Sequence, residues 1–196
     1  MKKITFSILF LCAVIISNAQ TFKPFKVDIS TGYAIPGGKG AKGGILFAVE
    51  PKYAVIPNLS VGLRFEAAVM ARGYSDQTGS NTEVDVKAAG SYLATADYYL
   101  TENTVRPFAG AGVGIFSLAS ASADNSSGSV GAGSKFGGLV RAGVEISHFR
   151  LGVEYNLVPT TTVTVFDGNS TYESKAKNGY IGIKIGAVIG GGKIKK

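Results

Sequence analysis

Residues 59–72 read LSVGLRFEAAVMAR, and this stretch decides the fold because apolar residues alternate in it with polar residues or glycine. Successive side chains of a β-strand point to opposite faces, so the alternation predicts a strand with one apolar and one polar face. The apolar face comprises Leu59, Val61, Leu63, Phe65, Ala67, Val69 and Ala71. The opposite face comprises Ser60, Gly62, Arg64, Glu66 and Arg72. Such a strand separates an apolar environment from a charged one.

Eight such stretches occur along the 196-residue chain, and short and long connections alternate between them. The expected strands cover residues 25–35, 44–55, 59–73, 86–99, 106–118, 135–147, 150–158 and 178–190. The short connections are 56–58, 100–105 and 147–149, and the longer ones, rich in turn-forming residues, are 36–43, 74–85, 118–134 and 159–177. In outer-membrane barrels the short turns are periplasmic and the long loops extracellular. The sequence therefore predicts an all-β fold: an eight-stranded antiparallel up-and-down transmembrane β-barrel with short periplasmic turns and longer extracellular loops.

The first 19 residues are expected to be a cleaved signal peptide. Lys2 and Lys3 precede an apolar run too short to span a membrane, and small residues then offer a cleavage site between Ala19 and Gln20. The only cysteine, Cys12, lies within this segment, so the mature chain has no thiol for catalysis, disulfides or metal binding. The expected organisation is a signal peptide at 1–19, an outer-membrane β-barrel at 20–190 and a basic periplasmic tail at 191–196.

Periodicity alone does not decide which face of the barrel is outside, because an exported soluble barrel of the lipocalin type would bury its apolar face. The export signal and the loop asymmetry favour the outer membrane of a Gram-negative cell, as do aromatic residues gathered near the strand ends. The aromatic girdle expected at the short-turn end comprises Phe25, Tyr53, Tyr98 and Phe149. The girdle expected at the loop end comprises Tyr33, Phe116, Phe136 and Tyr180. We therefore expect the apolar face of each strand to contact lipid.

Residues 106–114 read RPFAGAGVG, and this stretch resembles a strand of the small OmpA/OmpX-like outer membrane beta-barrel domain family. In that family a basic residue, a proline and an aromatic residue open the strand after a tight turn, and glycine follows at every second position. Residues 152–155 and the final strand are similar to the family's closing hairpin. The resemblance implies an eight-stranded barrel inserted by the outer-membrane assembly machinery, and it implies no single activity. Such barrels usually end on an aromatic residue, whereas this chain continues through GGGKIKK at 190–196, so its last strand would be recognised internally.

Nothing in the sequence predicts an enzyme. The only histidine, His148, falls in a short periplasmic turn, far from the outer rim where barrel enzymes place their base. Glu145 and Glu154 lie among arginines, where carboxylates stay ionised. The glycines at 110–114 lack the helix that a phosphate-binding glycine turn must open, and alternate glycines instead make room in a narrow barrel. The net charge of +7 is scattered rather than gathered in a stripe, so no nucleic-acid binding, cofactor or metal is expected.

Charged residues on the polar side of the expected strands are predicted to face the barrel lumen. They are Glu50, Arg64, Glu66, Arg141, Glu145, Glu154 and Lys184. Opposite charges in a low-dielectric lumen must pair, because an isolated buried charge is energetically costly. We expect a structural salt-bridge network that fills the barrel, and a gated ion path is the alternative.

The predicted function is a structural or surface-interaction role through the extracellular loops at 74–85, 118–134 and 159–177, without catalysis. A small-solute porin or transporter is the alternative, and an exported soluble lipocalin-like binding barrel is a third possibility. The expected partners are outer-membrane lipids, lipopolysaccharide and, during biogenesis, the assembly machinery. We expect the protein to be a monomer.

Overall fold

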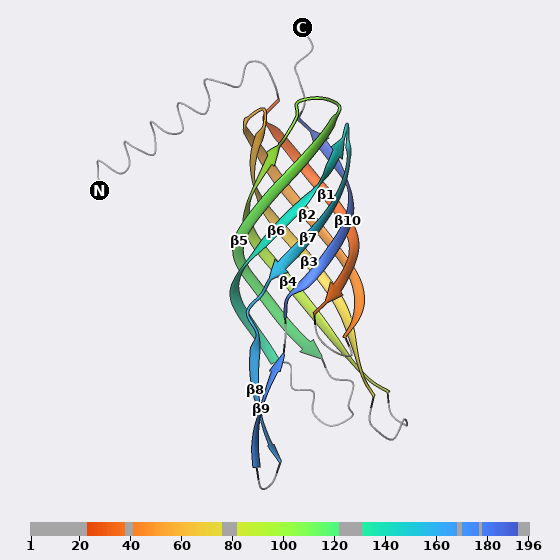
Figure 1. Ribbon diagram of the computed structural model, residues 1–196, viewed down its shortest axis with the longest axis vertical. Helices are drawn as coiled ribbons and strands as arrows, with labels where there is room; N and C mark the ends of the chain where they lie inside the picture. Colours follow the sequence, from red (N-terminus) through yellow and green to blue (C-terminus); the bar gives the residue numbers. More distant parts are fainter. Residues whose placement is uncertain are drawn as a thin grey trace, which may run out of the picture.

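The computed structural model describes residues 23–37, 41–75, 82–121, 131–167, 170–176 and 178–191, and it is a closed barrel of eight antiparallel strands (Figure 1). This architecture confirms the predicted fold class. Several strands reach further toward the loops than the sequence predicts, because strand pairing continues past the apolar repeat. The barrel strands are β1 (Phe25–Pro36), β2 (Ala41–Ile56), β3 (Leu59–Ser75), β4 (Thr82–Tyr99), β5 (Val105–Ala121), β6 (Gly131–Ile146), β7 (Phe149–Leu157) and β10 (Tyr180–Gly190).

The barrel closes where its first strand meets its last. β1 pairs with β10 from Lys26 opposite Gly190 to Pro36 opposite Tyr180, and β10 pairs on its other side with β7. The remaining strands pair with their neighbours in the chain. A closed ladder satisfies the backbone N–H and C=O groups within the barrel, which the hydrocarbon core of a membrane requires.

Short turns join the strands at one end of the barrel, which we call the turn end, where β1 begins and β10 finishes (Figure 1). A two-residue turn joins β6 to β7, and Ser147 within it has a positive φ of 56°. Positive φ in such turns matches the right-handed twist of antiparallel strands. Gly191 N–H donates to the carbonyl oxygen of Phe25 at 3.0 Å, which ties the start of β1 to the end of β10. The opposite end is the loop end.

A separate two-stranded hairpin extends beyond the barrel at the loop end (Figure 1). It consists of β8 (Thr161–Asp167) and β9 (Ser170–Ala176), which pair antiparallel from Thr161 opposite Ala176 to Asp167 opposite Ser170. The sequence interpretation treated the whole connection 159–177 as a loop and missed this hairpin. The alternation of threonine and valine at 161–165 carries the β propensity that explains it.

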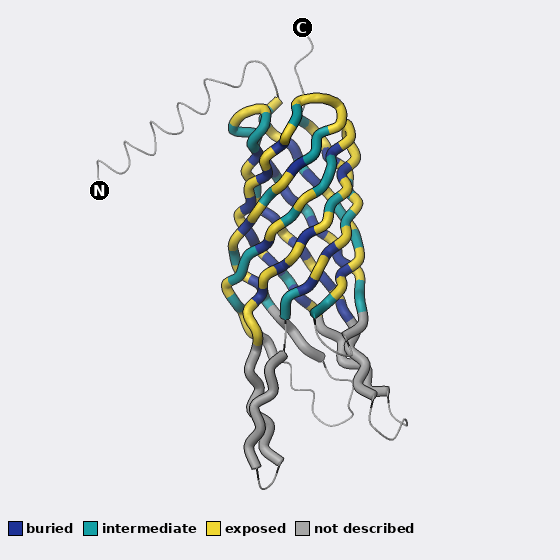
Figure 2. Tube along the Cα trace, in the orientation of Figure 1, coloured by how far each residue is buried: buried dark blue, intermediate teal, exposed yellow. Residues whose placement is uncertain are grey.

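Exposed and buried residues alternate along the barrel strands (Figure 2). Large apolar side chains are exposed on the outer surface, and charged side chains are buried in the interior. In β3, Leu63 and Phe65 are 56% and 45% exposed, whereas Arg64 between them is fully buried. A soluble lipocalin-like barrel would have the reverse arrangement, so that interpretation is wrong. No helix among the described residues is long and apolar enough to cross a membrane.

The aromatic girdles are only partly as predicted. At the loop end Tyr33 and Phe136 are exposed on the outer surface, but Phe116 and Tyr180 are only 0% and 1% exposed and point into the lumen. The strand period explains the error, because Tyr180 shares its face with the lumen residue Lys184. At the turn end Phe25, Tyr98 and Phe149 are exposed, and Tyr53 is half-buried.

Candidate functional site in the barrel lumen

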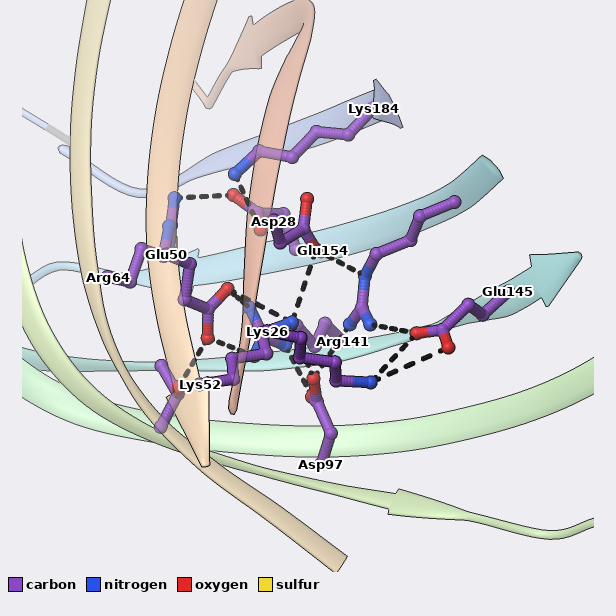
Figure 3. A network of polar contacts seen from close by, with 12 residues as sticks. Lys26, Asp28, Glu50, Lys52, Arg64, Asp97, Arg141, Glu145, Glu154 and Lys184 are labelled. Carbon is purple, nitrogen blue, oxygen red and sulfur yellow. Dashed lines mark hydrogen bonds and ion pairs between the residues drawn. The ribbon is translucent and has the colours of Figure 1, made fainter. Parts of the chain in front are cut away.

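The structure places all seven predicted lumen residues inside the barrel, but it divides them between two clusters of ion pairs (Figure 3). Glu50, Arg141 and Glu145 lie toward the turn end. Arg64, Glu66, Glu154 and Lys184 lie together on β3, β7 and β10. Among the described residues, no ion pair or side-chain hydrogen bond links the two groups directly.

The first group belongs to a larger set of four cations and four carboxylates, which we call the turn-side cluster. Its members come from five strands and are all nearly inaccessible to solvent at their side chains. Equal numbers of opposite charges leave no net charge to be buried, which low-dielectric burial requires. The members are Lys26, Asp28, Glu50, Lys52, Asp97, Arg141, Glu145 and Arg150.

Lys52 lies at the centre of the turn-side cluster. Its ammonium Nζ is 3.2 Å from Asp28 Oδ2, 3.0 Å from Asp97 Oδ2 and 3.4 Å from Glu50 Oε2. One cation therefore holds carboxylates from β1, β2 and β4. Its side chain is only 1% exposed, so this charge depends on its protein partners rather than on water.

Two arginines complete the cluster with geometry that lysine cannot provide. Arg141 donates from Nη1 and Nη2 to the two oxygens of Glu50 at 2.8 and 2.6 Å, a bidentate pair. Its Nε donates to Asp97 Oδ1 at 2.7 Å. Arg150 donates from Nη2 to Asp97 Oδ2 at 2.8 Å, and its Nε lies 3.0 Å from Asp28 Oδ2. Asp97 thus receives three cations.

Tyr99 closes the turn end of the lumen. Its hydroxyl donates to Glu145 Oε2 at 2.8 Å and accepts from Lys26 Nζ at 2.8 Å and from Arg150 Nη1 at 2.9 Å. The guanidinium carbon of Arg106 lies 4.2 Å from the Tyr99 ring centroid, a cation–π contact. Arg106 also donates to the carbonyl oxygen of Pro57 at 2.6 Å, which fastens the side chain across the mouth.

A cavity of about 380 Å³ lies outside this closure, among the short turns. His148 borders it, and the His148 Nδ1 atom is 3.0 Å from the carbonyl oxygen of Val188. His148 therefore lies in a short turn at the turn end, where the sequence places it.

The second group, with Tyr180 and Asn156, forms what we call the loop-side cluster. Arg64 Nη2 lies 2.7 Å from Glu154 Oε1 and also pairs with Glu66, while Arg64 Nη1 donates to Asn156 at 3.1 Å. Lys184 pairs with Glu66 and lies 3.0 Å from Glu154 Oε2. The Tyr180 hydroxyl donates to Glu66 at 2.6 Å. Two cations and two carboxylates again balance.

An apolar core fills the lumen near the loop end, and the sequence interpretation missed it. The sequence analysis assigned only polar residues and glycine to the inward face of each strand, so it did not predict large apolar side chains in the lumen. The structure shows a cluster of buried residues with at most 7% exposure. These residues are Ala34, Leu46, Ala68, Met70, Ala89, Leu93, Phe116, Leu139, Val158 and Tyr180.

The sequence interpretation also missed five charged members of the turn-side cluster: Lys26, Asp28, Lys52, Asp97 and Arg150. Strand alternation already placed Lys26, Asp28 and Arg150 on the polar faces of their strands, so that signal was present in the sequence.

Gly110 shows why the glycines of β5 matter to the lumen. A Cβ atom at this position would lie 2.1 Å from Asp97 Oδ1 and 2.7 Å from the carbonyl oxygen of Ala96. Any side chain there would displace the carboxylate from Arg141. The alternate glycine thus makes room for an ion pair, as the sequence analysis predicts.

The carboxylates of the two lumen clusters lie against cations. The interior carboxylates Glu145 and Glu154 are paired with cations, and within the described part of the chain no group of three or more His, Cys, Asp or Glu residues is placed to hold a metal ion. The expected signal cleavage site at Ala19 and Gln20 lies outside the described residues, as does most of the expected tail.

No protein-family model and no curated protein matches the sequence. Solved structures do match. The crystal structure of Neisserial surface protein A is similar with a TM-score of 0.55 and 17% identity, over 86% of this chain and 98% of that chain. The crystal structure of the outer membrane protein OprG from Pseudomonas aeruginosa has a TM-score of 0.54 and 13% identity, over 86% and 97%.

These similarities confirm the resemblance to small outer-membrane barrels at the level of the fold. The surface of the chain supplies the physical reason for a membrane location. Exposed apolar side chains encircle the barrel, whereas the charged side chains of the two clusters lie inside it and are paired. The chain has the fold and the apolar outer surface of an integral outer-membrane β-barrel.

Proposed function

We propose that this barrel is a rigid membrane anchor whose extracellular loops bind a partner at the cell surface, without catalysis. The observation that supports the proposal is the filled lumen. The turn-side cluster, the loop-side cluster and the apolar core occupy the interior of an eight-stranded barrel, which is only wide enough for side chains. Passage of small solutes, the alternative, would require all three to be displaced. The loops are therefore the elements left to carry a specific role.

The β8–β9 hairpin is the part of the loops that best fits a binding role. It forms a sheet of its own with two strands, so each strand has one outer edge that no described strand covers. Unpaired edges offer backbone donors and acceptors to an added strand. A hairpin isolated in water is only marginally stable, and a third strand would stabilise it. An extended segment of a surface protein is a suitable partner.

We also propose which molecules the barrel contacts in the membrane. The apolar belt contacts outer-membrane lipids, and the lysines at 39 and 42, in the connection expected at 36–43, contribute lipopolysaccharide contacts. The outer-membrane assembly machinery inserts the chain. A closed barrel leaves no strand edge within the membrane to pair with a second copy, so the protein acts as a monomer.

A loop-shortening experiment tests this proposal. Residues 160–177, which include the hairpin, are replaced by a short Asn-Gly turn, and a matched variant shortens residues 76–81 between β3 and β4. Both variants should keep the heat-dependent gel mobility of a folded barrel. Photo-crosslinking on intact cells should trap a surface partner with the wild type and the matched variant, and not with the hairpin variant. Crosslinks that persist without the hairpin would contradict its role as the binding element.

A further inference from the structure

A small cavity of about 20 Å³ lies between the two charge clusters. Asp28, Glu50, Arg141 and Arg150 of the turn-side cluster border it, and Glu154 and Lys184 of the loop-side cluster border it from the other side. Figure 3 shows the labelled side chains among them coming from different strands: Asp28, Glu50, Arg141, Glu154 and Lys184. The cavity is therefore bordered by both clusters.

One oxygen of Asp28 lacks a partner among the described residues. Asp28 is 3% exposed, and its Oδ2 atom faces Lys52 at 3.2 Å and Arg150 at 3.0 Å. Its Oδ1 atom is buried and receives no hydrogen bond from the described part of the protein. A buried carboxylate oxygen without a donor is destabilising, so a donor from outside the chain is favoured at this position.

The size and charge of the cavity identify the donor. A water molecule needs about 10–15 Å³ of accessible volume, so the cavity has room for one water and not for an organic solute. Three carboxylates and three cations border it, which gives no net charge to attract an ion. We propose that one water molecule occupies this cavity, donates a hydrogen bond to Asp28 Oδ1 and joins the two clusters into one network. Buried waters typically make about three hydrogen bonds, and Glu154 and Lys184 supply further partners.

Crystal structures with rubidium and bromide salts test the identity of the occupant. The wild type should show one solvent peak within hydrogen-bonding distance of Asp28 Oδ1, without anomalous signal from either ion. Gly152→Ala should remove this peak, because Gly152 borders the cavity and a Cβ there would make only ordinary contacts of 3.5 Å. Gly90→Ala is the control, since its Cβ would have no neighbour closer than 4.0 Å, and it should retain the water.

A double-mutant cycle between Asp28→Asn and Lys184→Gln tests whether the water joins the clusters. Each substitution changes the unfolding equilibrium constant by some factor. In the otherwise wild-type protein, the factor for the double substitution should differ more than about twofold from the product of the factors for the two single substitutions. In the Gly152→Ala background the factor for the double substitution should equal the product of the two single factors. A dry cavity, a rubidium or bromide peak, or independent effects in both backgrounds would overturn the inference.

Discussion

Replacement of Lys52 by methionine is expected to destabilise the barrel strongly. The substitution keeps most of the side-chain volume but removes the charge that lies within 3.0–3.4 Å of Asp28, Glu50 and Asp97. Three cations would then face four carboxylates in the turn-side cluster. Removal of one partner from a buried ion pair costs about 3–5 kcal/mol, because the other charge remains buried and uncompensated. We expect a loss of that size in the free energy of unfolding.

Gel mobility offers a direct assay, since folded outer-membrane barrels migrate differently from heated ones. The chain has no tryptophan, so the folded fraction is better measured from unheated gel samples across a urea series in lipid vesicles. Lys23→Met is the matched control, because Lys23 is exposed and a surface substitution changes stability by about 0.5 kcal/mol or less. If Lys52→Met unfolds at the same urea concentration as Lys23→Met, the turn-side cluster is not the tight network described above.

A second substitution tests whether charge balance in the turn-side cluster governs stability. Asp97→Asn in the Lys52→Met background restores three cations and three carboxylates in the turn-side cluster. The double variant should be more stable than the sum of the two single losses predicts, because neighbouring charges couple. Strict additivity would mean that charge balance in the lumen does not govern stability.

Three further predictions concern the faces of the strands and the turn end. Leu63→Arg should cost about 2–4 kcal/mol of folding free energy in vesicles, because Leu63 faces lipid. Ser60→Lys should cost less, because Ser60 borders the cavity at the turn end. Equal losses would contradict the assignment of the two faces. Gly110→Ala should destabilise the barrel by about 1–3 kcal/mol in the same urea titration, and Gly90→Ala should not, because only the first Cβ would clash. His148→Ala should leave both the urea midpoint and surface crosslinking unchanged, and loss of crosslinking would point to an unrecognised role for this turn.

The barrel itself was predictable from local pattern. In residues 59–72 apolar and polar residues alternate with a period of two, and this period shows which side chains share a face. That inference needs no knowledge of distant strands. Alternation of short and long connections then orders the strands as hairpins. Inward charges such as Arg64 and Glu154 follow from the same period, and the structure places them 2.7 Å apart.

The partners within the lumen were not predictable in the same way. Whether Arg64 meets Glu154 or Glu145 depends on the tilt and stagger of strands far apart in the chain, which the period of two does not encode. Asp97 receives three cations from three different strands for this reason. Phe116 lies on an inward face by its period, but its aromatic character suggested a membrane girdle instead. The β8–β9 hairpin was missed because its two strands are short and lie within a long connection.

The sealed lumen is the central claim, and single-channel recording in planar bilayers tests it most directly. Purified wild-type protein should show no steady conductance, because paired charges and an apolar core fill the interior. The double variant Arg64→Ala with Arg141→Ala removes one cation from each cluster and should admit cations past the uncompensated carboxylates. Large, steady conductance of the wild-type barrel would contradict the account and favour the passage of small solutes.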